Sequence, residues 1–384
     1  ARAGRRVLLV DKAAFPRDKC CGDGLTTGAL RVLEQLGLDP ATVPSWTPVD
    51  AAWVRSPSGR EVRFPMPDGP GVYAVVARRI DLDAALVDLA RQAGVEVREG
   101  HGFAGGITQH DDCVVTDIEG LGEVRARYVI AADGMWSPVR KALGLSEPGY
   151  LGEWHAFRQY VQDVTGPAAH RLYVWFEADM LPGYAWSFPL PGGRANVGFG
   201  VLRDGERRIQ DMKQTWAGLF DRPHIAEALG AGAHPESRHL AWPIPARIDT
   251  AVNTAGRVLF VGDAARATDP MTGEGIGQAL LTGTLAAEAI VGAGALHPER
   301  AADAYERDLR DHLLADHRMS ILLGRALRHG WGARGSVRVA GATAWTRRNF
   351  GRWLFEDEPR AIALTPGRWH RRFLARPGAY ARRG

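Results

Sequence analysis

The sequence predicts an α/β fold in which a parallel-sheet domain with crossover helices is interrupted by an antiparallel sheet and followed by a helical region. Two short apolar runs, residues 7–10 and 258–261, lead into the acids Asp11 and, after Gly262, Asp263, as strands do at the ligand-binding edge of a parallel sheet. Between them, alternating segments within 151–249 indicate antiparallel strands. With 384 residues, 45% of them hydrophobic, the chain can bury a large core divided among two or three domains.

Helix and strand signals alternate along the rest of the chain in a Rossmann-like pattern with β insertions. Thr26 and Thr27 can cap a helix that Gly37 ends, and helical spacing over 78–94 stops at Gly94. The Pro- and Gly-rich stretch 46–71 is expected to hold short strands. The other expected elements are strands over 72–77, 95–100 and 128–132, and helices over 206–229 and from about 273 onward.

The C-terminal region carries most of the positive charge. The chain has a net charge of +4, but residues 318–384 hold fifteen arginines against Glu356, Asp357 and Glu358, which leaves the remainder at −8. Several tryptophans and phenylalanines lie among these arginines. Such a segment suits either an anionic membrane surface or a solvated helical region whose aromatic side chains cover the core. No nucleic-acid module is recognised, so a peripheral membrane contact is the preferred interaction.

Three cysteines, two of them adjacent, do not form a disulfide framework, and a reducing cytoplasmic setting is the simplest interpretation. No run of 18 apolar residues predicts a membrane-spanning helix, and the N-terminus begins as a strand rather than as a signal peptide. The expected location is therefore cytoplasmic, with attachment to the inner face of the membrane. No metal site is predicted.

The segment "RVLFVGDAARATDPMTGEGIGQAL" combines a buried strand with a glycine-rich helix start. Gly262 permits close approach of a ligand to the backbone, and Asp263 places a carboxylate at the carboxyl end of the strand. The helix that starts near Gly273 leaves N–H groups free to stabilise negative charge. The segment resembles the flavin-binding segment of the class of FAD enzymes typified by p-hydroxybenzoate hydroxylase. That resemblance implies FAD contacts at Gly262, Asp263, Pro270, Gly273, Gly275 and Ile276.

Two further segments resemble the same class. In "VIAADGMWSPVRKALGL" a strand turns at Asp133-Gly134 into a helix, which resembles the motif that shapes the pyrophosphate region of FAD. In "VARRIDLDAAL" the Arg-x-x-Leu-Asp pattern implies that Arg79 reaches FAD. A surface arginine at a helix start remains the alternative for Arg79, and Arg78 is an ambiguous neighbour.

The resemblance narrows to the geranylgeranyl reductase family on two segments, "FPRDKCCGDGL" and "LPGYAWSFPLPGGRANVGFG". The first matches that family's Pro-x-x-x-Cys-Gly segment beside the isoalloxazine ring and implies that Cys21 is catalytic, as a proton source or as a group that shapes the site. The second implies an apolar wall for a polyprenyl chain. Strand alternation places three of its residues on one face, although a core-facing stripe would look the same. The wall residues are Tyr184, Trp186, Phe188 and Pro189.

The strand at 7–10 fits the second strand of an FAD-binding βαβ unit, with Asp11 on the adenosine ribose or, alternatively, as a surface acid. The first strand and its G-x-G-x-x-G turn are expected about 20 to 30 residues earlier, so we interpret the sequence as an N-terminally truncated piece. The domains expected are a discontinuous FAD-binding domain (1–45, 72–150 and 250–295), a substrate domain (46–71 and 151–249) and a basic helical region (296–384).

The function implied by the resemblance is FAD-dependent reduction of C=C bonds in a polyprenyl lipid or a quinone side chain. NAD(P)H or a reduced carrier protein would reduce the flavin. One alternative is a flavin monooxygenase acting on small aromatics with O₂, which shares the FAD motifs. The other is a flavin-free remnant of such an enzyme.

Overall fold

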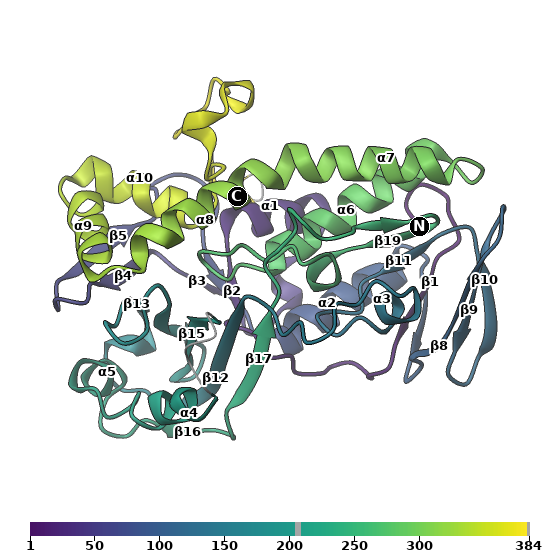
Figure 1. Ribbon diagram of the computed structural model, residues 1–384. Helices are drawn as coiled ribbons and strands as arrows, with labels where there is room; N and C mark the ends of the chain where they lie inside the picture. Colours follow the sequence, from purple (N-terminus) through teal and green to yellow (C-terminus); the bar gives the residue numbers. More distant parts are fainter. Residues whose placement is uncertain (204–208, 382–384) are drawn as a thin grey trace.

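Parallel strand pairs with crossover helices form one part of the molecule, as Figure 1 shows for the computed structural model, which describes residues 1–203 and 209–381. β1 (Leu8–Asp11) pairs in parallel with β7 (Glu96–Glu99), and β11 (Val129–Ala131) pairs in parallel with β19 (Val258–Phe260). The smaller strands of this part are β2 (Gly24–Leu25), β3 (Thr47–Pro48), β6 (Val75–Val76), β8 (Phe103–Gln109), β9 (Val114–Ile118), β10 (Gly122–Ala126) and β18 (Thr254–Ala255).

Two of the helices around these strands, at 27–35 and 79–92, begin and end within two residues of the positions that the sequence indicates. Thr26 caps the first of them by accepting a hydrogen bond from the Ala29 N–H at 3.3 Å, and Gly37 follows its end with φ of 76°. Ser137 caps the short helix after β11. The helices are α1 (Thr27–Gln35), α2 (Arg79–Gln92), α3 (Pro138–Ala142), α6 (Ile276–Ala293) and α7 (Pro298–Leu309), with short helical turns η1 (Pro40–Thr42) and η3 (Gly262–Ala265).

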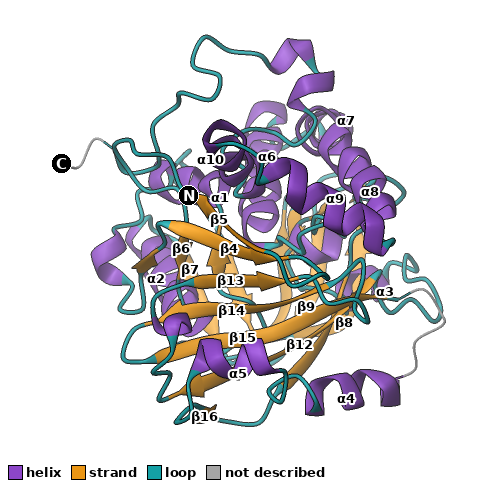
Figure 2. Cartoon of the chain, turned by 90° about the vertical axis from the view of Figure 1, so that its left-hand side faces the viewer, coloured by secondary structure: helices purple, strands orange, loops and turns teal. Residues whose placement is uncertain are grey.

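A second, largely antiparallel sheet of eight strands lies beside this part, and Figure 2 shows most of its strands stacked from β5 down to β12. Apolar side chains pack on both of its faces, against α4 (Ile209–Ala217) and α5 (Pro223–Leu229) on one and against α9 (Gly330–Ala340) and α10 (Ala344–Leu354) on the other. Its elements are β4 (Ala51–Arg55), β5 (Glu61–Pro65), β12 (Trp154–Gln162), β13 (Leu172–Trp175), β14 (Tyr184–Leu190), β15 (Arg194–Leu202), β16 (His234–Pro235), β17 (Leu240–Ile244), α4 (Ile209–Ala217), α5 (Pro223–Leu229) and η2 (Pro167–Ala169).

The chain ends in a helical region that packs across the edge of the large sheet at β5 (Figures 1 and 2). It consists of η4 (Arg310–Leu314), α8 (Ala315–Leu327), α9 (Gly330–Ala340), α10 (Ala344–Leu354), η5 (Ile362–Leu364) and η6 (Pro366–Arg368). The α/β fold with an added antiparallel sheet and a helical C-terminal region is thus confirmed. The domain boundaries given above remain a prediction.

Three details differ from the sequence-based expectations. The helix expected over 206–229 is two helices, because the chain turns at 218–222 and Pro223 begins a new one; residues 206–208 lie outside the described residues. The strand expected over 72–77 is only Val75–Val76. The strand expected to be buried over 128–132 is Val129–Ala131, and its central Ile130 is 42% exposed.

Among the described residues, α6 is the helix whose length and mean hydropathy of 1.3 would allow it to cross a membrane. It packs against α1 and α7, and Leu285, Ala286 and Ala289 are buried in the core around β19. These contacts are those of a core helix.

A buried cluster of ion pairs links the C-terminal region to α1. The Asp357 side chain is fully buried between Arg31 and Arg352, whose Nε lies 2.9 Å from the carboxylate. We expect Asp357→Asn to lower the free energy of unfolding by about 3–5 kcal/mol, because it leaves two buried guanidinium groups without their anion. Urea denaturation would measure the loss. Asp50→Asn, which removes the exposed Arg63–Asp50 pair, is the control and should cost at most about 1 kcal/mol; an equal effect of both variants would contradict the expectation.

Candidate active site

A cavity of about 560 Å³ lies where the large sheet, the parallel-stranded part of the molecule and the C-terminal helices meet. Strands of the large sheet, the start of α6, the loop 19–24 and α8, α9 and α10 all contribute to its lining. Eleven of the residues predicted from sequence line it: Cys21, Arg79, Gly134, Tyr184, Trp186, Phe188, Gly262, Asp263, Gly273, Gly275 and Ile276. The structure therefore brings the three flavin motifs, the cysteine segment and the aromatic segment to one place.

Four predicted residues lie outside this lining: Asp11, Asp133, Pro189 and Pro270. Asp11 ends β1 and accepts a hydrogen bond from the Ala13 N–H at 2.9 Å. Pro189 faces away from the cavity because it alternates with Phe188 along β14, so the structure does not place it in the wall.

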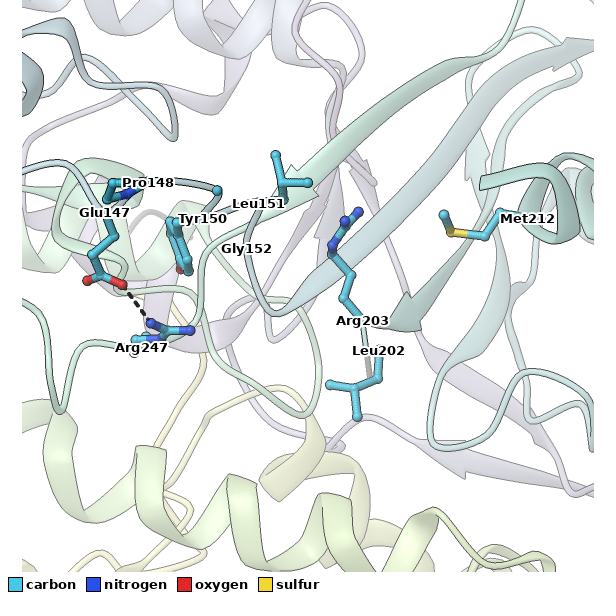
Figure 3. A pocket seen from close by; sticks show the side chains of 10 residues that line it. Glu147, Pro148, Tyr150, Leu151, Gly152, Leu202, Arg203, Met212 and Arg247 are labelled. Carbon is cyan, nitrogen blue, oxygen red and sulfur yellow. Dashed lines mark hydrogen bonds and ion pairs between the residues drawn. The ribbon is translucent and has the colours of Figure 1, made fainter. Parts of the chain in front are cut away.

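A second pocket, of about 430 Å³, holds none of the predicted residues (Figure 3). Its lining includes Glu147, Tyr150 and Arg247, and Arg247 pairs with Glu147 at 2.9 Å. We do not assign it a role in the chemistry.

The start of α6 and the end of β19 form the edge of the cavity at which the sequence motifs predict flavin contacts. Gly275 caps α6 without a side chain. Gly262 has φ of 58°, and a methyl group at this position would lie only 3.2 Å from the Ala279 Cβ. Within residues 1–203 and 209–381, the Asp263 carboxylate makes only long contacts, 3.4 Å to the Thr268 hydroxyl and 3.9 Å to Lys19 Nζ. Its carboxylate therefore remains available to a ligand hydroxyl.

The turn at Asp133-Gly134 fits a bound cofactor as well. One carboxylate oxygen of Asp133 accepts the Val139 N–H at 2.9 Å, whereas its buried Oδ1 has no hydrogen-bond partner among the described residues. Gly134, with φ of 80°, lines the cavity. A buried polar atom without a partner beside a cavity is a position where a ligand donor fits. The carboxylate oxygens of Asp133 and Asp263 can thus accept hydrogen bonds from a ligand at the cavity, which suits FAD.

Arg79 is fixed before any ligand binds. Its Nε and Nη2 contact the two Asp83 oxygens at 2.7 and 2.9 Å, and Arg79 and Cys21 both line the cavity. Burial raises the pKa of the Cys21 thiol, and the charge of Arg79 opposes that rise. Arg78, the ambiguous neighbour, lies over the Tyr160 ring at 4.5 Å instead.

A buried polar network links the loop 19–24, which carries Cys21 and is called the cysteine loop below, to the large sheet. Asn196 on β15 is fully buried; it donates to the Cys21 carbonyl and to an Asp23 carboxylate oxygen, both at 2.8 Å. The Trp186 indole donates to Asn196 at 3.1 Å, and the Tyr160 hydroxyl donates to Asp23 at 2.8 Å. Burial raises the pKa of Asp23 to about 6. The network ties the aromatic wall to the cysteine loop.

Sequence reasoning missed the contribution of the C-terminal helices to the cavity. The residues that it did not assign are Leu323, Ala326, Leu327, Ser336, Val337, Phe350, Trp353, Leu354 and Phe355. The signal that could have found them is the acidic run 356–358 inside a basic segment. Those acids pair with buried or part-buried partners: Glu356 with Arg360, and Asp357 with Arg31.

Comparison with known proteins decides the family. The FAD binding domain family matches residues 1–309. A menaquinone reductase of Mycobacterium tuberculosis (strain H37Rv) is 32% identical over 345 residues, which cover 80% of this chain and 76% of that protein. The chain belongs to the geranylgeranyl reductase-like family of FAD-dependent oxidoreductases.

Other relatives agree with this assignment. Digeranylgeranylglycerophospholipid reductase 2 of Methanopyrus kandleri is 31% identical over 296 residues, covering 75% of this chain and 71% of that protein. The crystal structure of a geranylgeranyl bacteriochlorophyll reductase-like protein from Thermoplasma acidophilum superimposes with a TM-score of 0.78 at 20% identity, covering 96% of this chain and 94% of that chain. The latter match supports the fold.

Proposed function

We propose that this oxidoreductase reduces C=C bonds of a polyprenyl lipid or of the isoprenoid side chain of a quinone. The observation that carries the proposal is the single cavity in which residues of the flavin motifs, the thiol of Cys21 and the aromatic side chains of β14 come together. The names of the relatives, menaquinone reductase and digeranylgeranylglycerophospholipid reductase, point to the same two substrate classes.

Bound FAD would supply the hydride chemistry, with NAD(P)H or a reduced carrier protein as the electron donor. The chain's own residues would bind and orient the cofactor and the substrate. In this proposal Asp263 and the start of α6 hold the cofactor, and Tyr184, Trp186 and Phe188 exclude water and align the isoprenoid chain. Cys21 contacts the reacting double bond. Asp11, Asp133, Pro270 and Arg79 keep their predicted roles toward FAD.

A panel of lipids tests the substrate class. The FAD-loaded protein would be supplied with a reductant and with a prenyl quinone, a digeranylgeranyl glycerophospholipid or geranylgeranyl diphosphate. Mass spectrometry should find two hydrogen atoms added for each bond reduced in at least one of them. A protein that leaves all three unchanged would contradict the proposal, as would hydroxylation of a small aromatic with consumption of O₂.

We also propose that the C-terminal helices contact an anionic membrane. Helices α8 and α9 line the cavity on one side, and on the same helices Leu322, Trp331 and Val339 are 56%, 67% and 70% exposed. Arginines surround them in the sequence. A lipid substrate would then pass from the bilayer into the cavity next to these side chains.

Removing two exposed indoles tests this contact. We expect the double variant Trp331→Ser/Trp345→Ser, which removes indoles that are 67% and 64% exposed, to bind vesicles that contain anionic lipid about a hundredfold more weakly or worse, because burial of each large apolar side chain contributes about 1.5–3 kcal/mol. Sedimentation with the vesicles measures the loss. Trp136→Ser removes an indole that is 52% exposed just before α3 and serves as the control. Unchanged binding by the double variant would exclude these two tryptophans from the membrane contact.

A further inference from the structure

A cluster of buried and part-buried carboxyl groups lies at the start of α6, where the C-terminal region meets the cavity. It contains Asp269 and Glu274 from the segment before α6 and Glu356 from the loop after α10, with Arg360 as the cation among them. None of these residues belongs to the roles assigned above. Glu274 lines the cavity between Gly273 and Gly275.

Asp269 and Arg360 form a matched pair. Arg360 Nε lies 3.1 Å from Asp269 Oδ2, and both side chains are at least nine-tenths buried. Asp269 also accepts hydrogen bonds from Ser320 at 2.6 Å and from the N–H and hydroxyl of Thr272 at 2.8 Å. These bonds stabilise the ionised carboxylate and lower the pKa of Asp269.

Glu356 is a second carboxylate that contacts Arg360. Its Oε1 accepts from Arg360 Nη2 at 3.1 Å and from the Gln278 amide at 3.4 Å, and its Oε2 accepts from the Thr26 hydroxyl at 3.2 Å. Both oxygens are thus acceptors, as in a carboxylate. The cluster thus contains three carboxyl groups, those of Asp269, Glu274 and Glu356. The guanidinium of Arg360, which balances their charge, already pairs with Asp269.

Glu274 is the acid without a cation. Its Oε1 accepts the Gly277 N–H at 2.6 Å, and no ion pair to Glu274 occurs within residues 1–203 and 209–381. The charged and titratable groups around it are Asp269 on its own segment, Glu356 and Arg360 from the C-terminal loop, and Tyr184 from β14. Burial and the negative charge of Glu356 raise the pKa of Glu274, and burial raises that of Glu356.

We propose that Glu274 and Glu356 hold one proton between them and that Glu274 donates it to the substrate, an inference that rests on the proposed function. In that step the O–H bond of Glu274 breaks and a C–H bond forms at one carbon of the alkene. Bound reduced FAD would supply the hydride for the other carbon and would lose two electrons. The Glu274 carboxylate then takes a proton from water. Cys21 contacts the same bond without giving up its thiol proton.

Infrared spectroscopy tests the shared proton independently of turnover. FAD-loaded protein with isotope-labelled glutamate side chains should show the band of a protonated carboxyl at neutral pH. Glu274→Gln should remove that band. Glu356→Gln should lower the pH at which the band disappears by about one unit or more, because the neighbouring negative charge is gone. Glu288→Gln, on the exposed face of α6, is the matched control and should leave the band in place.

Turnover tests the donation. Glu274→Gln should retain FAD and the KM of the lipid but lower kcat by about a hundredfold or more, as the loss of a general acid does. In Glu356→Gln the alkaline limb of the pH–rate profile should move to lower pH together with the infrared band. Absence of a protonated carboxyl at neutral pH overturns the inference. A band that Glu274→Gln removes without slowing turnover overturns the donation. If the wild-type protein reduces no isoprenoid, the proposed function fails and the donation with it, while the band still decides the shared proton.

Discussion

Asn196→Ala is expected to lower the free energy of unfolding by about 3–5 kcal/mol and to release the cysteine loop from the aromatic wall. The side chain is fully buried and bonds the Trp186 indole, the Cys21 carbonyl and the Asp23 carboxylate. Its removal leaves those three groups short of a partner, and each unsatisfied buried group costs about 1–3 kcal/mol. Urea denaturation measures the stability.

The release of the loop has its own readout. In a Cys20→Ser background, the Cys21 thiol should react faster with a thiol reagent when Asn196 is replaced, because the loop that carries it is no longer bonded to β15. Asn349→Ala is the control, since its amide makes an exposed hydrogen bond to the Trp345 carbonyl. A variant at Asn196 as stable and as slowly modified as the wild type would show that the network does not position the loop.

Asp263→Ala is expected to weaken FAD binding by about 10- to 150-fold. The carboxylate follows β19 at the cavity, and in the described part of the chain its contacts are those of 3.4 and 3.9 Å, so it can accept hydrogen bonds from the cofactor. A hydrogen bond to a charged group contributes about 1.5–3 kcal/mol, which corresponds to that range.

Retention of flavin after dialysis, followed by absorbance, measures this loss. Asp303→Ala removes an exposed carboxylate on α7 and should retain FAD like the wild type. Full occupancy of the Asp263 variant would remove Asp263 from the cofactor site.

Local sequence signals were sufficient for the elements that carry the predicted motifs. The hydroxyl cap at Thr26 and the glycines after β19 act within a few residues, so the starts of α1 and α6 can be read from the sequence. Strand alternation likewise placed Tyr184, Trp186 and Phe188 on the cavity face. Alternation also explains why Pro189, next to Phe188, is absent from the cavity lining.

Long-range packing could not be read in this way. The contribution of Val337 and Phe355 to the cavity depends on how α9 and α10 dock, and helix periodicity does not say which element covers which. The partner of Glu274 is 82 positions away in the sequence, at Glu356, so the acid cluster is a product of tertiary structure. The break between α4 and α5 was missed although Pro223 marks it.

The most direct test of the account is reoxidation of the reduced flavoprotein by lipid without oxygen. FAD-loaded protein would be reduced chemically under nitrogen and mixed with a prenyl quinone whose ring is already reduced, or with a digeranylgeranyl glycerophospholipid. If the protein reduces isoprenoid C=C bonds, the flavin absorbance returns and the lipid gains two hydrogen atoms for each flavin oxidised. A flavin that stays reduced with every isoprenoid, and is reoxidised only by O₂, would contradict it.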